Sequence, residues 1–180
     1  MAMVRAAEIV GVLANLVYTW LYLQGEVPFA YVWAAIGSLA LMWACAKRSL
    51  LAESGLHLFY LLMAGVGAWV ALEWKSPGTA SWEWHVMGIG LGIMAWGALI
   101  QPLKAKGSAM PALDSFTTVF SVLATWWMIH LDDLNWWYWL VIDAASIYLY
   151  AKRGMPWGAL LFFVYELMAI DGCFEAISWF

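Results

Sequence analysis

Charged side chains are scarce in this sequence. They make up 11% of its 180 residues, whereas about a quarter of a typical soluble domain is charged. Proline and cysteine are also rare, with 5 and 2 residues. So little charge excludes an ordinary water-soluble domain, and so few cysteines exclude a disulfide-rich scaffold. We expect Cys45 and Cys173, which lie in apolar segments, to be small buried side chains.

Apolar residues fill the sequence instead, at 66% of the chain with a mean hydropathy of +0.79. They form seven segments that predict transmembrane helices, because only helices satisfy the backbone in lipid at this length. The run after Arg5 is similar to the start of a signal peptide but lacks a small-residue cleavage site, so we keep it as the first span. The expected fold is an all-α integral membrane protein with a single transmembrane domain over residues 1–180. The predicted spans are 8–23, 29–46, 50–74, 85–101, 115–130, 135–150 and 155–179.

Lysine and arginine are distributed unevenly between the two sides of these spans. Seven of the eight lie on one side, and Lys75 alone lies on the other. The side rich in basic residues normally faces the cytoplasm. We therefore expect a cytoplasmic N-terminus and an external C-terminus. The seven basic residues are Arg5, Lys47, Arg48, Lys104, Lys106, Lys152 and Arg153.

The chain also contains an internal repeat. A shift of 105 residues aligns 46–74 with 151–179 at 11 identical positions. The identities include Lys47-Arg48 with Lys152-Arg153, and Gly67 with Gly172. A chain that crosses the membrane three times ends on the side opposite to its start. A second copy with the same orientation therefore needs one more helix between the two copies. We thus predict a 3+1+3 parallel repeat, with 8–74 as the first repeat, 85–101 as the linker and 114–179 as the second repeat, the plan of SWEET transporters.

Several polar residues fall near the middle of the predicted spans, where they are costly unless they face a cavity. Counting about 1.5 Å per residue places Asn15, Ser121, Asp143 and Glu166 at a similar depth. Ser121 shares a helix face with Thr118 and Thr125, and helix packing explains Ser121 as well as substrate contact does. Asn135, Trp136 and Trp139 open the span that carries Asp143. Two indoles above a carboxylate suit a flat cation, through stacking and cation–π attraction.

Segments 114–124, 135–143, 147–150 and 165–172 resemble the Pnu family of bacterial nicotinamide riboside transporters, which has thiamine- and riboflavin-carrying relatives. The hallmark Trp-x-x-Trp of the family falls on Trp136 and Trp139, and Tyr165 lies in the last matching segment. The resemblance implies a SWEET-like fold, a bacterial inner-membrane location, a homo-trimer, and facilitated diffusion made one-way by a cytoplasmic kinase. His57 and Ala64 stand where nicotinamide riboside carriers have Gln and Asn, so thiamine, or less readily riboflavin, stays open as substrate.

The sequence also bears on other functions that a seven-helix membrane protein could have. A retinal protein needs a lysine inside a span, and all five lysines lie in loops. The sequence has no His-Glu-x-x-His motif of an intramembrane protease and no nucleotide-binding loop of a pump. A non-transporting scaffold subunit remains an alternative, although it would not need Asp143 and Glu166 at one depth. We expect no enzyme activity, cofactor, metal or nucleic-acid partner; the expected partners are a small vitamin and the lipid bilayer.

Overall fold

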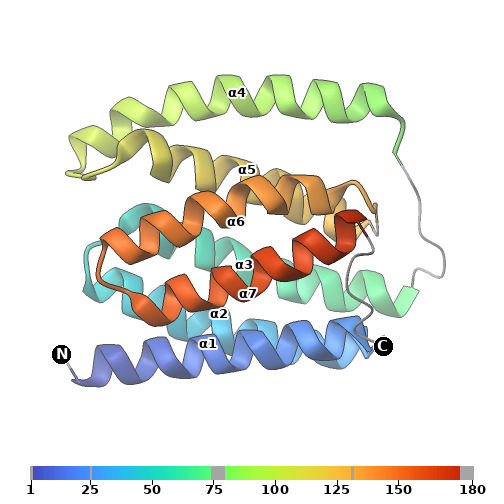
Figure 1. Ribbon diagram of the computed structural model, residues 1–180, viewed down its shortest axis with the longest axis horizontal. Coiled ribbons are helices and arrows are strands. Elements are labelled where there is room, and N and C mark those ends of the chain that lie inside the picture. Colours follow the sequence, from blue (N-terminus) through green and yellow to red (C-terminus); the bar gives the residue numbers. More distant parts are fainter. Residues whose placement is uncertain (1, 25, 74–79, 131, 175–180) are drawn as a thin grey trace. The chain divides into compact units, whose positions relative to one another are not determined.

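The computed structural model describes all residues except 1, 25, 74–79, 131 and 175–180, and its regular elements are all α-helices (Figure 1). The prediction of seven helices is confirmed. Most ends lie within four residues of the predicted positions, but the first helix begins six residues earlier because Ala2–Ala7 are mostly good helix formers. The predicted end at 179 lies outside the described residues. The helices are α1 (Ala2–Leu23), α2 (Val27–Lys47), α3 (Leu51–Glu73), α4 (Trp82–Ala105), α5 (Pro111–Ile129), α6 (Asn135–Lys152) and α7 (Pro156–Phe174).

Six of these helices are long and apolar enough to cross a bilayer. The exception is α6, which has 18 residues and begins with Asn135 and a run of aromatic side chains. Asp143 near its centre lowers its apolar character further. The chain is therefore a multi-pass membrane protein, and α6, the less apolar helix, carries more of the predicted site residues than any other helix.

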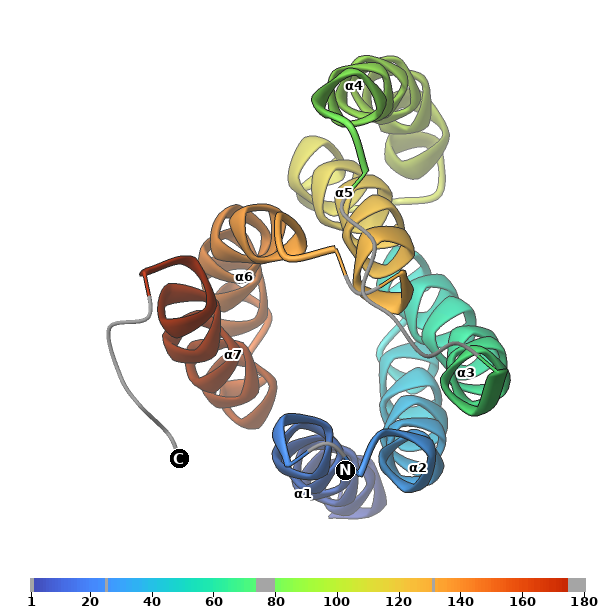
Figure 2. The ribbon, with the colours of Figure 1, turned by 90° about the vertical axis from the view of Figure 1, so that its right-hand side faces the viewer.

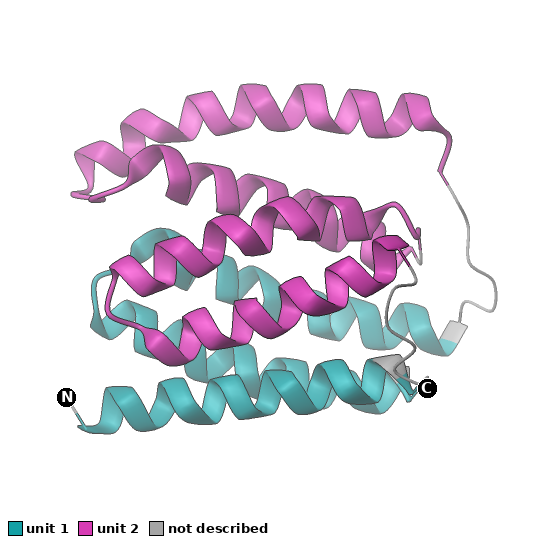
Figure 3. Ribbon diagram, in the orientation of Figure 1, with its two compact units in different colours: residues 1–75 teal, residues 76–180 magenta. Residues whose placement is uncertain are grey.

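The helices form two compact units, residues 1–75 and residues 76–180 (Figure 3). In the first unit, α2 packs against both α1 and α3. In the second unit, α6 packs against both α5 and α7, and α4 packs on the other side of α5 (Figure 2). Each unit thus contains three consecutive helices whose middle member contacts the other two. The predicted linker helix is α4, and it belongs to the second unit.

Small residues allow the helices of the first unit to approach closely. Gly11 of α1 lies against Leu41, and Gly37 of α2 lies against the amide of Asn15. Ala34 and Ala64 pack around Tyr31 in a buried cluster. Small residues are common where membrane helices meet, because the hydrophobic effect does not drive helices together in lipid and close packing must hold them.

Equivalent positions in the two units have similar surroundings. Under the shift of 105 residues, the end of α2 at Lys47 falls on the end of α6 at Lys152, and the start of α3 falls on the start of α7. The turns that follow α2 and α6 also agree. Ser49 has φ 58° and Gly154 has φ 66°, which is the left-handed region that favours glycine.

Two helix contacts are repeated as well. The ring of Tyr31 on α2 lies against Gly67 of α3, and the ring of Trp136 on α6 lies against Gly172 of α7. Both the aromatic residues and the glycines are 105 positions apart. In each unit a large ring on the middle helix therefore fills the space that a glycine leaves open on the third helix.

Candidate functional site

One face of α6 carries three polar side chains at intervals of four residues, of which two are buried. Asn135 is 5% exposed and Asp143 is 1% exposed, and Trp139 lies between them. Residues four apart stack above one another on a helix. Asn135 Oδ1, Trp139 Nε1 and Asp143 Oδ1 are buried and have no hydrogen-bond partner among the described residues. Asn135, Trp139 and Asp143, all three predicted site residues, thus lie on one polar stripe.

The amide of Asn135 is held in one orientation. Its Nδ2 donates to the carbonyl oxygen of Asp132 at 2.6 Å. The backbone N–H of Asn135 donates to the same oxygen at 3.0 Å. Because the bond from Nδ2 fixes the amide, the unpaired Oδ1 can accept a hydrogen bond from a ligand.

Helix α7 adds a second carboxyl group to this stripe. Glu166 is partly exposed, its Oε2 is buried without a hydrogen-bond partner, and it lies within electrostatic range of Asp143. Tyr165 precedes it, and its ring packs edge-on against Phe162 with centroids 6.0 Å apart. The structure therefore brings Glu166 to Asp143, whereas the described contact of Tyr165 is with a neighbour on its own helix.

Unpaired buried polar atoms are uncommon in folded proteins, since each costs about 1–3 kcal/mol. Here four of them, on two adjacent helices, include one indole donor and three oxygen acceptors. A ligand that has both hydrogen-bond donors and acceptors would satisfy them. Two carboxyl groups nearby favour a ligand with positive charge.

The three tryptophans at the start of α6 have different surroundings. Trp136 is partly buried and its ring lies against Gly172. Trp137 is 47% exposed and packs edge-on against Phe174 with ring centroids 5.2 Å apart. It also lines an apolar groove of about 360 Å³ between α4, α5 and α6, which none of the predicted site residues lines. Trp137 therefore belongs to the outer surface of the second unit, apart from the polar stripe.

Helix α5 supplies the small polar residues that the sequence predicted. Ser121 is 1% exposed, and Thr125 donates its hydroxyl to the Ser121 carbonyl oxygen at 2.7 Å. Thr117 makes a similar bond to its own helix, so the hydroxyl groups of these two threonines are satisfied within α5. Thr118 is partly exposed. Ser121 and Thr118 remain candidates on α5, the helix that packs directly against α6.

Asn15 lies in the first unit. It is 9% exposed, its Nδ2 donates to the Gly11 carbonyl oxygen at 2.9 Å, and its amide lies against Gly37. These contacts give Asn15 a helix-packing role between α1 and α2. The residues that the structure brings together, Asn135, Trp139, Asp143 and Glu166, all belong to the second unit.

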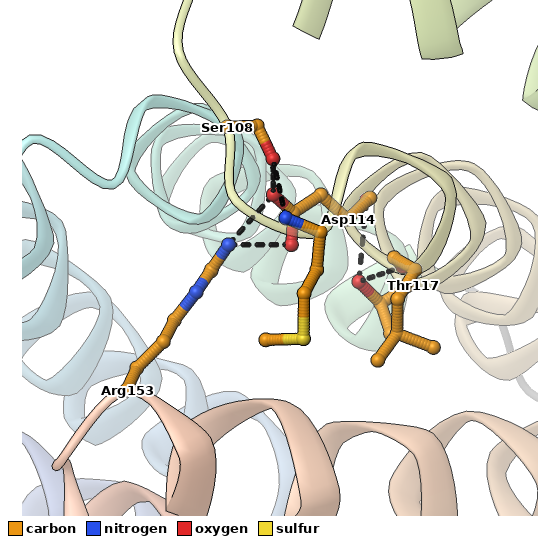
Figure 4. Close-up of polar contacts among 6 residues, drawn as sticks. Ser108, Asp114, Thr117 and Arg153 are labelled. Carbon is orange, nitrogen blue, oxygen red and sulfur yellow. Dashed lines mark hydrogen bonds and ion pairs between the residues drawn. The ribbon is translucent and has the colours of Figure 1, made fainter. Parts of the chain in front are cut away.

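Two buried ion pairs were not predicted from the sequence. Arg153 follows the end of α6 and contacts both oxygens of Asp114 on α5 at 2.6 Å (Figure 4). Ser108 also donates its hydroxyl to Asp114. In the first unit, Arg48 contacts Glu8 at 2.8 Å. The aligned Lys-Arg pairs were a signal for these contacts, because a buried arginine at equivalent positions requires a carboxylate partner in each unit.

Another polar cluster lies at the beginning of α6, at the other end of this helix from Arg153. Asp132 is fully buried, accepts hydrogen bonds from the backbone N–H groups of Ala80 and Leu134, and lies 3.3 Å from His85 Nε2. The other ring nitrogen of His85 is 3.0 Å from the Tyr138 hydroxyl. This cluster ties α4 to the beginning of α6. Local sequence patterns gave no signal for it, since His85 and Asp132 are 47 positions apart.

Comparisons with known proteins agree with this architecture. A family model described as nicotinamide mononucleotide transporter matches residues 5–179. Among solved structures, the crystal structure of the vitamin B3 transporter PnuC is similar, with a TM-score of 0.72 and 19% sequence identity. The match covers 94% of this chain and 78% of that chain. At this identity the likeness shows a shared fold. Comparison with curated proteins finds no match.

Proposed function

The chain belongs to the nicotinamide mononucleotide transporter family, and from this we propose that it imports a flat cationic vitamin precursor, nicotinamide riboside in the first place. It is a membrane transporter and not an enzyme, as its family indicates. The observation that carries the choice of substrate is the stripe of unpaired polar atoms on α6, which includes Asp143 and has Glu166 beside it. A pyridinium ring carries positive charge and offers its faces to the nearby indole of Trp139.

The same carboxyl groups favour the riboside over its phosphorylated form. A phosphate group carries about two negative charges near neutral pH. Residues 107–151 and 154–180 contain no lysine or arginine that would neutralise it. A mononucleotide would therefore bring its phosphate into a region with two carboxyl groups and no described cation. We expect the transported form to lack the phosphate.

We further propose that the chain follows the 3+1+3 repeat with α6 as a true span. The equal ends of α2 and α6, the equivalent turns at Ser49 and Gly154, and the repeated contacts of a ring with a glycine support it. Transport in such carriers takes place at a midplane site. We propose facilitated diffusion without an ion gradient, with uptake made one-way when a cytoplasmic kinase phosphorylates the vitamin. We also propose a homo-trimer in a bacterial inner membrane.

Binding titrations of the purified protein test the substrate. Nicotinamide riboside, nicotinamide mononucleotide, thiamine and riboflavin are each added while the tryptophan fluorescence is recorded. We expect saturable quenching by nicotinamide riboside and weaker binding of the mononucleotide. Thiamine is the second candidate, because it is also a flat aromatic cation that Asp143 and Trp139 would accept. Preferential binding of riboflavin would contradict the charge argument, and binding of none of the four would favour the scaffold alternative.

A further inference from the structure

A lysine lies over an aromatic ring at the same place in both units. Lys47 Nζ is 5.7 Å from the centre of the Trp43 ring at the end of α2. Lys152 Nζ is 5.5 Å from the centre of the Tyr148 ring at the end of α6. The lysines are 105 positions apart, and so are the aromatic residues. The two pairs, here called the Lys–aromatic pairs, therefore occupy equivalent positions with nearly the same geometry.

The side chains of both pairs face outward. Trp43 is 36% exposed and Tyr148 is 54% exposed, and both lysines are exposed. Neither lysine has a carboxylate partner among the described residues. A lysine on an interfacial ring keeps its stem along the apolar surface and its ammonium group toward the headgroups. The pairs thus present a positive charge where the helix leaves the hydrocarbon.

The arginine next to each lysine points the other way. Arg48 contacts the buried carboxylate of Glu8, and Arg153 contacts that of Asp114. The two Lys-Arg dipeptides therefore divide their roles identically. Each arginine is neutralised inside its own unit, whereas each lysine remains available to a partner outside the chain.

Among the described residues, no exposed acidic side chain offsets the basic charge at this end of either unit. In the first unit, Arg5 and Lys47 are exposed there, while Glu8 and Glu53 are buried. In the second unit, the exposed cations at the equivalent end are Lys104, Lys106 and Lys152, while Asp114 is buried. Among the described residues at these helix ends, exposed charge is thus basic only. A surface of this kind attracts anionic lipids.

We propose that each Lys–aromatic pair binds the phosphate headgroup of an anionic phospholipid, which gives two equivalent lipid sites per chain. The ammonium group of Lys47 or Lys152 contacts the phosphate. The exposed ring beside it lies along the glycerol region, where tryptophan and tyrosine are enriched in membrane proteins. The ring selects a lipid over free phosphate, because a soluble anion has no apolar part for it to contact.

Native mass spectrometry of the detergent-purified full chain tests this proposal. The protein is titrated with phosphatidylglycerol, with phosphatidylcholine and, in a separate arm, with inorganic phosphate. We expect the parent to retain two phosphatidylglycerol molecules more tightly than phosphatidylcholine. Lys47→Gln and Lys152→Gln should each weaken one of the two sites about fivefold, which corresponds to about 1 kcal/mol per basic residue at the membrane surface. The double variant should weaken both.

Lys104→Gln is the matched control, because Lys104 is exposed in the second unit and has no described ring beneath it. It should leave both lipid sites intact. Equal losses from Lys104→Gln and Lys152→Gln would replace the two sites by a diffuse charge effect. Equal binding of the two lipids, or equal competition by inorganic phosphate, would also overturn the proposal. Trp43→Leu keeps the charge and should still weaken the first site; unchanged binding would show that the ring has no part in it.

Discussion

At the scale of single residues, Asp143 is a buried carboxyl group of the second unit with a second carboxyl group near it. It is 1% exposed, one of its oxygens has no partner, and Glu166 is within electrostatic range. A charge about 5 Å from a carboxylate gains roughly 3 kcal/mol at an effective dielectric constant near 20. Desolvation of both groups offsets much of this gain, so the net effect should be on the order of 1–2 kcal/mol.

Asp143→Asn should therefore weaken the binding of a cationic vitamin about tenfold, since about 1.4 kcal/mol corresponds to a factor of ten. The substitution keeps the shape of the side chain and removes its charge. Fluorescence titration of the variant with nicotinamide riboside measures the change. A neutral analogue with the same ring should bind almost as well as it does to the parent. If Asp143→Asn and Glu166→Gln both retain full affinity for the cation, the two carboxyl groups have a structural role.

The tryptophans of α6 should differ in their effect on the substrate. Trp139→Ala removes an indole worth about 0.5–2 kcal/mol of cation–π attraction, so the affinity should fall between about twofold and thirtyfold. Trp136→Ala should also lower it, together with the melting temperature, because its ring packs against Gly172. Trp137→Ala is the control, since Trp137 is on the exposed groove. A loss of affinity in Trp137→Ala equal to that in Trp139→Ala would assign the indoles to a common interfacial role.

The relative position of residues along neighbouring helices was predictable from the sequence, because a helix advances by a constant rise per residue. This placed Asp143 and Glu166 together, and the structure brings them within electrostatic range. The orientation of the Asn135 amide was not predictable. It depends on a turn in which Asp132 offers its carbonyl oxygen, and such a turn is not encoded by helical periodicity.

At the scale of helices, the two arginine pairs should contribute unequally to stability. The Arg153 side chain is 9% exposed and meets both oxygens of Asp114, whereas that of Arg48 is 23% exposed and meets one oxygen of Glu8. Removing one partner of a buried pair costs about 3–5 kcal/mol, because the other charge stays buried without compensation. Arg153→Met should therefore lower the melting temperature more than Arg48→Met does.

A double-substitution cycle separates the pair from the side chains that form it. Asp114→Asn with Arg153→Met should recover part of the stability lost in Arg153→Met alone, as measured by thermal unfolding in detergent. Lys152→Met is the control, because Lys152 is exposed and its substitution should change stability by about 0.5 kcal/mol or less. Additive losses in the cycle would mean that the Arg153–Asp114 contact contributes nothing specific.

Helix ends were predictable where the sequence changes character abruptly. Lys47-Arg48 and Lys152-Arg153 interrupt apolar runs, and α2 and α6 end at these lysines. The beginning of α1 was less predictable, because its first residues are helix formers without an apolar pattern. The cluster of His85, Asp132 and Tyr138 escaped prediction for a different reason. It joins residues of α4 and α6 to Asp132 in the connection between α5 and α6, and the 105-residue repeat has no copy of α4 that would have pointed to it.

At the scale of the whole molecule, the distribution of basic residues predicts the topology. Seven of the eight lysines and arginines lie on one side when all seven helices cross the membrane. A reporter that is active only outside the cytoplasm should therefore work when fused after Phe180, and the same reporter inserted after Lys106 should be silent. Since α6 is the helix that falls short of the apolar spans, a cytoplasmic Phe180 together with a cytoplasmic Lys106 would indicate that α6 does not cross the bilayer.

The energetics of transport provide the most demanding test of the whole molecule. The sequence contains no nucleotide-binding loop, and the carboxyl groups of the candidate site, Asp143 and Glu166, suit a cationic substrate without a coupling ion. Purified protein in vesicles should therefore equilibrate labelled nicotinamide riboside to equal concentrations on both sides when the membrane potential is held at zero, with or without an imposed proton or sodium gradient. Enclosing a kinase that phosphorylates nicotinamide riboside, together with ATP, should raise the total label inside above the outside level.

Vesicles with Asp143→Asn should approach the same end point more slowly at low substrate concentration, because a passive carrier changes the rate and not the equilibrium. Accumulation that follows an imposed ion gradient at zero membrane potential and in the absence of the kinase would refute facilitated diffusion, and Asp143 and Glu166 would then be the first candidates for carrying the coupled proton.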